Sequence, residues 1–576
     1  MLDLKIVGGN LVDGTGSPAY RGDLGILDGR IVAIGTVNEG ARETISAEGQ
    51  VVAPGFIDTH THYDAQVFWD PLLTPSCYHG VTTVIGGFCG FSIAPMTPDA
   101  AGYLAPMLAR VEGMPLETLQ AGVPWNWSSF GSYLTNLEGT LGLNAGFYVG
   151  HSTVRRIAMG KRAVGHWATA DELEQMKKLV GDSLREGALG FSTTLSHSHN
   201  DADGNPVPSR HASRDELLAL ARVVRMHDGT GLELLPKLNF DPEMVELMTD
   251  FSLAGGRPVN WNVMSVTGAK PADKERIRKW LSVSDHARAR GAEVIGLIFV
   301  SSPNLLVNFA SGVVFEGFPG WAPLFQLKQA ERALKLKDAA FRQELDALAH
   351  SEEAARRSLL ARWDAYRVIT TFSDATAPYQ GKLVSEVAAA IGKSAFDTML
   401  DIAIEDDLLT VFMCPESGEN QETYDLRASL WKDDRTVIGA SDAGAHMDLI
   451  DTFAMTTRLL QKGVREYGVI SLEEAVHQLT EVQARLIGLR ERGVLRAGWH
   501  ADVVVFNPDT VGRGEVHTRL DLPGGHGRLY AEAVGVSHVV VNGTVIVRDG
   551  KHTGAQPGKV LRSGQDTYTV VIPANK

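Results

Sequence analysis

Two histidines separated by one residue follow an early apolar run of the chain. They are His60 and His62, in the segment GFIDTHTHYD at 55–64. Alternate side chains of a strand point the same way, so both imidazoles are expected to project together from the end of one strand. Two imidazoles on one face are half of a typical zinc site. Much later, Asp442 ends another apolar run in VIGASDAGAH, where a carboxylate can bind a metal or take a proton from water.

Short apolar runs alternate with amphipathic helical stretches through the middle of the chain. The eight runs cover 51–60, 81–87, 146–151, 188–194, 231–236, 258–264, 293–300 and 436–442. Helices are predicted at 169–187 and 213–229, where a Thr or Ser cap precedes acidic residues. The alternation is typical of α/β units with a parallel sheet, and eight strands close a (β/α)8 TIM-type barrel. Such barrels carry their chemistry at the C-terminal ends of the strands.

Both ends of the chain have a β pattern instead. The pairs Asp28-Gly29 and Asn542-Gly543 stand between apolar runs and predict hairpin turns. We therefore expect 1–53 and 486–576 to form one small β-sandwich domain beside a barrel at 54–485. A helical insertion is predicted at about 301–408, on the catalytic side, where it can act as a lid; its aromatic residues are expected mainly to pack its own core.

Composition excludes several classes of function. The chain has 576 residues and a net charge of −15, without a Lys/Arg run interleaved with aromatics, which argues against nucleic acid and anionic membranes as partners. Three cysteines, Cys77, Cys89 and Cys414, are too few for a disulfide framework and favour a reducing compartment. We expect a soluble cytoplasmic protein with a small-molecule substrate, and a homo-oligomer is compatible with this pattern.

Several strand ends together resemble a known family. The segments VVAPGFIDTHTHYD, HGVTTVIGGFCGFSIAP, YVGHSTVR, EGALGFSTTL and VIGASDAGAH are similar to those of the amidohydrolase superfamily, specifically its N-acyl-D-amino-acid deacylase (D-aminoacylase) branch. The resemblance extends to the terminal segments LRAGWHADVVVFNP and VVVNGTVIVRDGK. It implies that a cysteine after the second strand, here Cys89, serves as a metal ligand. With His60, His62 and Asp442 it would complete a four-ligand zinc set, whereas its alternative role is that of a small buried hydrophobe.

The chain departs from this branch at the fifth and sixth strands, TGLELLPKLNF and RPVNWNVMSVTG, which lack the family's metal-binding histidines. Glu233 is a fair substitute ligand and Asn262 a poor one. Three interpretations remain: one metal at the histidine pair and Asp442, with Cys89 or Glu233 completing the shell; a second site rebuilt from other histidines; or loss of the metal. We favour the first. The basic residues that clamp the substrate carboxylate in the family are also missing.

These observations predict a metal-dependent hydrolase of an amide-type C–N bond, with one zinc ion. The resemblance implies deacylation of an N-acyl (D-)amino acid or a related small amide. Hydroxide formed on the metal would attack, and Asp442 would act as general base and then acid. His151 or a loop histidine would stabilise the oxyanion. The expected substrate contacts are His197, His199, Arg155 and Asn262. The alternatives are a hydrolase of a cyclic amide, carbamate or other bond on this scaffold, and a metal-free binding descendant.

Overall fold

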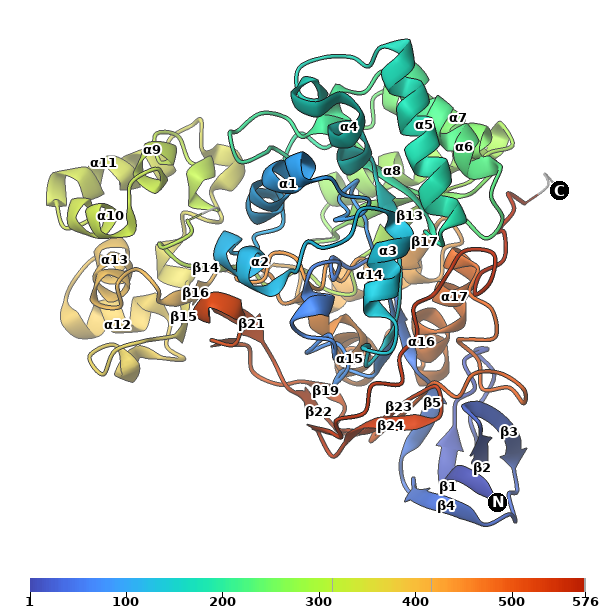
Figure 1. Cartoon of the computed structure of the whole chain (residues 1–576). Coiled ribbons are helices and arrows are strands. Elements are labelled where there is room, and N and C mark those ends of the chain that lie inside the picture. The colour runs from blue at the N-terminus through green and yellow to red at the C-terminus, as the bar shows by residue number, and fades with distance from the viewer. Residues whose placement is uncertain (313, 416, 574–576) are drawn as a thin grey trace.

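The computed structural model describes residues 1–312, 314–415 and 417–573, so the end of the expected C-terminal segment, 574–576, lies outside the described residues. A sheet of nine strands joins the two ends of the chain (Figure 1). Its members are β1 (Leu2–Leu11), β2 (Tyr20–Leu27), β3 (Arg30–Gly35), β4 (Ala41–Ser46), β5 (Val51–Pro54), β18 (Val503–Phe506), β23 (Val536–Val541), β24 (Thr544–Arg548) and β25 (Lys551–His552). β5 and β18 pair antiparallel at its centre.

Both predicted hairpins are confirmed. Asp28 and Gly29, between β2 and β3, have φ of 49° and 75°, and Asn542 and Gly543, between β23 and β24, have φ of 45° and 80°. Two successive positive φ angles are the signature of the type I′ turn, whose twist matches that of the flanking strands.

Parallel strands stand at all eight predicted positions. They form two sheets: β6 (Phe56–Asp58), β7 (Val81–Gly86) and β8 (Asn144–Phe147); then β9 (Val149–Gly150), β10 (Gly190–Thr194), β11 (Gly231–Leu235), β12 (Val259–Met264), β13 (Val294–Ile298) and β17 (Thr436–Ile438). One residue separates β8 from β9, and the single bridge between Thr61 and Ala443 brings the first and last strand ends together. Among the described residues the hydrogen bonds therefore do not run around a closed ring.

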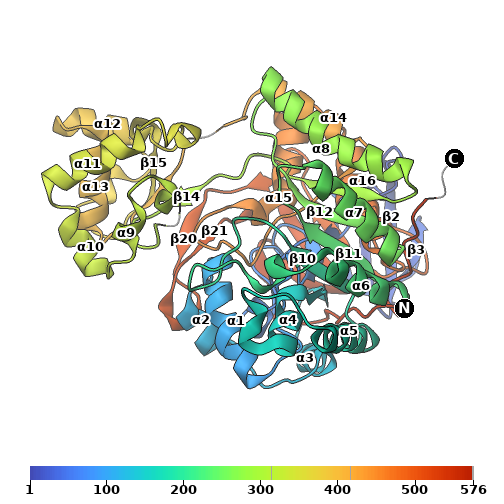
Figure 2. The same cartoon turned by 90° about the horizontal axis from the view of Figure 1, so that it is seen from above.

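Amphipathic helices pack on the outer side of these strands, as Figure 2 shows around β10, β11 and β12. Those before β8 are α1 (Pro98–Val111), α2 (Leu116–Gly122) and α3 (Phe130–Leu137). The later ones are α4 (His151–Met159), α5 (Ala170–Arg185), α6 (Arg214–Arg225), α7 (Pro242–Gly255), α8 (Pro271–Ala289), α14 (Gln421–Trp431), α15 (Met455–Arg458), α16 (Leu472–Leu479) and α17 (Glu481–Ile487). The predicted Thr and Ser caps are present: Thr169 accepts from the backbone of Glu172, and Ser213 caps α6.

The insertion forms a lobe with its own apolar core, set apart from the other helices in Figures 1 and 2. It contains β14 (Leu306–Val307), α9 (Ala322–Phe325), α10 (Gln329–Lys335), α11 (Ala339–Ala349), β15 (Arg367–Thr370), α12 (Val384–Ile391), α13 (Ala395–Glu405) and β16 (Val411–Met413). The helical pattern did not indicate the antiparallel sheet β14-β16-β15, which carries the lobe past residue 408. Its aromatic residues are buried in the lobe's core: Phe309, Phe315, Phe318, Trp321 and Phe325.

A C-terminal hairpin reaches this lobe. It consists of β20 (His517–Arg519) and β21 (Arg528–Tyr530), and β20 contacts β15 of the lobe. Figure 1 shows the hairpin on the side of the lobe. The Thr518 N–H donates to Thr370 Oγ1 at 3.3 Å, and the Leu529 N–H donates to the carbonyl of Met447 at 2.6 Å. The hairpin thus links the lobe to the loop that follows β17. No helix among the described residues is long and apolar enough to cross a bilayer.

Candidate metal centre and active site

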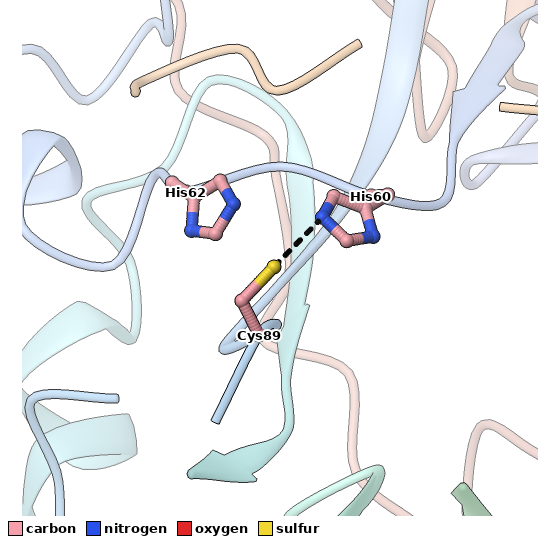
Figure 3. A group of neighbouring side chains, drawn as sticks. All are labelled: His60, His62 and Cys89. Carbon is pink, nitrogen blue, oxygen red and sulfur yellow. Dashed lines mark hydrogen bonds between the residues drawn. The ribbon is translucent and has the colours of Figure 1, made fainter. Parts of the chain in front are cut away.

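Four predicted ligands meet where three strands end. His60 and His62 follow β6, Cys89 follows β7 and Asp442 follows β17. The candidate ligand atoms of His60, His62 and Cys89 all lie within 4.8 Å of one another (Figure 3). His60 Nε2 is 3.2 Å from Asp442 Oδ1 and 3.7 Å from Cys89 Sγ, and His62 Nε2 is 3.7 Å from the same oxygen of Asp442.

These separations match the spacing of ligands around one tetrahedral ion. With Zn–N and Zn–O bonds of about 2.0 Å and a Zn–S bond of about 2.3 Å, the ligand atoms stand roughly 3.3–3.5 Å apart. Imidazole nitrogen, thiolate and carboxylate oxygen are also the donors that zinc prefers. The residues present therefore fit a zinc ion.

The backbone at this site adopts costly conformations. Cys89 and Asp442 have φ of 55° and 51°, in the left-handed region that non-glycine residues rarely occupy. Gly87, in the same loop as Cys89, has φ of 79°, and a Cβ there would lie 2.1 Å from the carbonyl oxygen of Tyr148. Such conformations cost of order 1–3 kcal/mol each and cluster at functional sites. The glycines of GGFCG thus allow the chain to bring Cys89 to the histidines.

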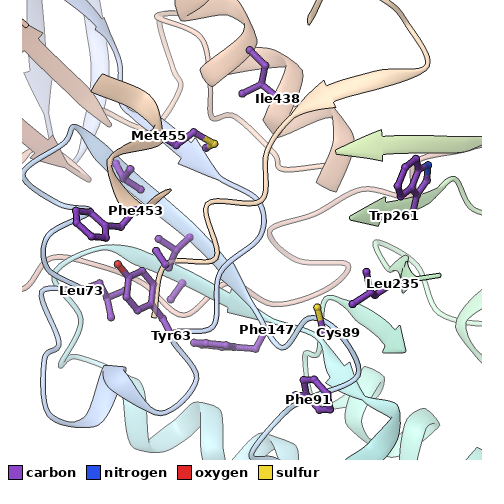
Figure 4. Close-up of a cluster of buried hydrophobic side chains, with 14 of the residues drawn as sticks. Tyr63, Leu73, Cys89, Phe91, Phe147, Leu235, Trp261, Ile438, Phe453 and Met455 are labelled. Atoms are coloured by element: carbon purple, nitrogen blue, oxygen red, sulfur yellow. The ribbon is translucent and has the colours of Figure 1, made fainter. Parts of the chain in front are cut away.

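Apolar side chains pack against His60 and Cys89. The Phe88 ring stacks on the His60 ring with centroids 4.5 Å apart, and Cys89 belongs to the main apolar core, drawn with Phe91 and Leu235 in Figure 4. His60 is fully buried, whereas the Asp442 side chain is 18% exposed. Asp442 is therefore the most exposed of the four candidate ligands.

Glu233 and Asn262 stand where the resembling family has histidines, and both contact Cys89. The Asn262 amide donates to Cys89 Sγ at 3.3 Å, and the Cys89 backbone N–H donates to Glu233 Oε2 at 3.1 Å. Glu233 Oε1 is buried and has no hydrogen-bond partner among the described residues. Both side chains therefore contact the cysteine, and Glu233 keeps one buried oxygen free of a hydrogen bond among the described residues.

Burial and neighbouring charges shift the pKa values of the ligands. Burial, with Glu233 and Glu112 beside it, raises the pKa of the Cys89 thiol well above its usual value. Burial alone would raise the pKa of Asp442, but His60 and His62 hold it well below its usual range. Burial alone would lower the pKa of His62, but Glu112 and Asp442 raise it to about 9. Strong perturbation in a pocket is typical of functional groups.

Two residues at this site were not predicted from the sequence. Glu112 follows α1, and its Oε1 lies 3.6 Å from His62 Nδ1. His446, whose N–H donates to the carbonyl of Glu112 at 2.5 Å, lines a cavity next to the site. Glu112 belongs to no strand end, so no periodic signal marked it. His446 could have been found, because it follows Asp442 closely in the SDAGAH segment.

The two histidines predicted to contact the substrate, His197 and His199, lie in different surroundings. His199 lines the cavity together with His446, and burial lowers the pKa of His199 to about 3. His197 is exposed and lies 3.3 Å from Arg210.

The structure does not bring His151 or Arg155 to the cluster. His151 Nδ1 lies 2.8 Å from Thr193 Oγ1 and Nε2 lies 2.9 Å from Glu216 Oε1. Arg155 is fully buried and donates to both oxygens of Glu216 at 2.5 Å. Both ring nitrogens of His151 and the two terminal guanidinium nitrogens of Arg155 have hydrogen-bond partners outside the cluster, so the catalytic role of His151 and the substrate contact of Arg155 stay predictions.

Comparison with known proteins identifies the class of this chain. A family model described as amidohydrolase family matches residues 43–547. The chain therefore belongs to the amidohydrolase family, as the sequence indicated, and it is a metal-dependent hydrolase of C–N bonds other than peptide bonds.

The chain is also similar over nearly its whole length to individual proteins and solved structures. A D-aminoacylase of Alcaligenes xylosoxydans xylosoxydans is 29% identical over 97% of both chains, and an uncharacterized protein of Mycobacterium tuberculosis is 30% identical over 98% of this chain and 96% of its own. Two solved structures, a D-aminoacylase described with a binuclear metal center and an N-acyl-D-glutamate deacylase from Bordetella bronchiseptica complexed with zinc and a phosphonate inhibitor, each align with a TM-score of 0.64. Each is 27% identical, over 98% of this chain and 100% of the solved one.

Proposed function

We propose that this chain deacylates N-acyl-D-amino acids or related small amides with one zinc ion held by His60, His62, Cys89 and Asp442. The observation that carries the proposal is the convergence of these four side chains at the spacing of tetrahedral ligands. The relatives named as D-aminoacylases and N-acyl-D-amino acid deacylases support the substrate class, because they align over nearly the whole chain.

One ion rather than two is supported by the groups around Cys89. A second ion beside the thiolate needs further strong ligands. Here the Asn262 amide donates to Sγ, and Asn is a poor zinc ligand. Glu233 offers a carboxylate there, but its Oε2 already accepts from the backbone N–H of Cys89. We therefore assign Glu233 and Asn262 to positioning the thiolate.

The bound metal would supply a water whose pKa falls from 15.7 to about 7 and would polarise the scissile carbonyl. Asp442 Oδ1 faces both histidines, which leaves Oδ2 to accept the proton of the attacking water and return it to the leaving nitrogen. We assign the donor role first expected of His151 to His199 or His446, because these histidines line the adjacent cavity. Apolar walls around His60 and Cys89 exclude other water from the reaction.

We further propose that the parallel strands form a (β/α)8 TIM-type barrel over 54–485 and that 1–53 with 486–576 form a small β-sandwich. The eight strand positions and the shared terminal sheet support this division. The lobe at about 301–413 would cover the catalytic side. Three buried free cysteines support a cytoplasmic setting.

The test is hydrolysis of N-acetyl-D-amino acids and their L enantiomers by purified protein. Hydrolysis is measured before the metal is removed with a chelator, after its removal, and after zinc is restored. We expect turnover that disappears with the metal, returns with it and prefers the D series. Metal-loaded protein that leaves all N-acyl amino acids intact but opens a cyclic amide or cleaves a carbamate would overturn the substrate class.

A further inference from the structure

The cavity next to the candidate metal centre has a volume of about 310 Å³. Its lining includes His199, His446 and Asp448. Glu112 connects it to the cluster: its carbonyl accepts from His446 and its carboxylate faces His62. This inner chamber is thus where a substrate bound at the cluster would extend.

A second chamber of about 500 Å³ continues the first. The two share part of their lining, namely Ala109, Gly113, Asn308, Ser311 and Asp448. The outer chamber lies between the lobe, which contributes Phe372 and Leu409, and the C-terminal hairpin, which contributes Leu520. Its lining is mainly apolar.

Three exposed apolar side chains converge on this outer chamber. Phe372 is 39% exposed, Leu409 is 42% exposed and Leu520 is 63% exposed. They come from distant parts of the chain, yet all line one cavity. Large exposed apolar side chains gathered on one concave surface mark a binding site for an apolar group.

The charged groups of the outer chamber do not suit an anion. Asp448 repels a carboxylate, and Arg528 already binds the carboxylates of Asp521 and Asp70. His526 Nε2 lies 3.6 Å from Glu117 Oε2. Placing the charged half of an N-acyl amino acid among Phe372 and Leu409 would remove its hydration without a partner, which is costly. Burying the uncharged acyl half of the substrate in the chamber carries no such desolvation cost.

We propose that the outer chamber binds the acyl chain of the substrate, and that the enzyme acts on amides with an extended aliphatic acyl group rather than on acetyl amides alone. This inference rests on the proposed function. Each methylene that enters the apolar chamber should raise kcat/KM about fourfold until the chamber is filled.

The experiment measures kcat/KM for N-acetyl-, N-butyryl-, N-octanoyl- and N-decanoyl-D-leucine with the zinc-loaded enzyme. The quantity compared is the decanoyl-to-acetyl ratio within each protein. We expect a ratio well above one hundred in the wild type, and at least a tenfold lower ratio in Leu409→Asp and in Leu520→Asp. The matched control is Leu334→Asp, since Leu334 is 70% exposed on the same lobe but lines neither chamber.

Binding of decanoate, measured by calorimetry, separates this inference from the proposed function. Hydrolysis of the acetyl compound with no dependence on chain length would overturn the inference while leaving the proposed function intact. If no amide is hydrolysed, but decanoate binds the wild type and Leu334→Asp and not Leu409→Asp, the proposed function fails while the chamber is supported as a site for an aliphatic chain. If the protein neither hydrolyses any of the amides nor binds decanoate, both the inference and the proposed function are overturned.

Discussion

Replacing Glu216 by Gln should destabilise the protein strongly without acting on the reacting atoms. The Glu216 carboxylate is the shared partner of two fully buried side chains: His151 Nε2 donates to it at 2.9 Å and Arg155 donates to both of its oxygens at 2.5 Å. Removing one member of a buried charged pair leaves the other uncompensated and costs about 3–5 kcal/mol. The Arg155 side chain has no solvent exposure with which to recover hydration.

The assay is urea unfolding of wild type and Glu216→Gln at pH 7, followed by circular dichroism. The control is Asp182→Asn, which breaks the surface pairs with Lys178 and Arg185 and should change the unfolding free energy by at most about 1 kcal/mol. The pKa of Glu216 lies below its usual value, because His151 and Arg155 together outweigh the effect of burial. Its stabilisation is therefore complete above the unfolded pKa of about 4.3 and is lost as pH falls through the lowered folded pKa.

The difference between wild type and Glu216→Gln should accordingly be full at pH 7 and shrink below about pH 4. An unfolding free energy unchanged at pH 7, together with loss of hydrolysis, would refute this reasoning. It would mean that His151 and Arg155 serve the reaction after all.

Chelation of the metal should abolish hydrolysis, and zinc should restore it, as measured by release of the free amino acid. Asn262→Ala removes the amide that donates to Cys89 Sγ and should weaken zinc binding about 10- to 100-fold in a competition titration; unchanged affinity would contradict that positioning role. Gly87→Ala should lower thermal stability markedly, because its Cβ would overlap the carbonyl of Tyr148. By contrast, Gly102→Ala, exposed within α1 with no atom beyond its own stretch of helix within 4 Å of the added Cβ, should stabilise by up to about 1 kcal/mol.

The local sequence pattern was sufficient to predict the parallel strands, the two hairpins and three of the candidate ligands. The eight parallel strands were visible because each is a short apolar run bounded by turn or cap residues, and the two hairpins because Asp-Gly and Asn-Gly favour positive φ. His60 and His62 were found because the period of a strand puts them on one side, and Asp442 because it ends a strand.

The remaining features depend on contacts between distant segments. Glu112 reaches His62 from the end of α1, a helix with no special relation to the first strand. Likewise, β16 joins β14 and β15 across most of the lobe, and sequence alone does not indicate such long-range pairing. The pairing of Arg155 with Glu216 was not predicted, because Glu216 lies on α6, in a separate part of the sequence.

Metal content per chain tests the central claim most directly. Native protein would be analysed for zinc beside His60→Ala, Cys89→Ala and Asp442→Ala, with His517→Ala as the control, since His517 lies on the C-terminal hairpin away from these ligands. We predict about one zinc ion per chain in the wild type and the control, and a large loss in the three ligand variants. Absence of bound zinc in the wild type, even after reconstitution, would contradict the account.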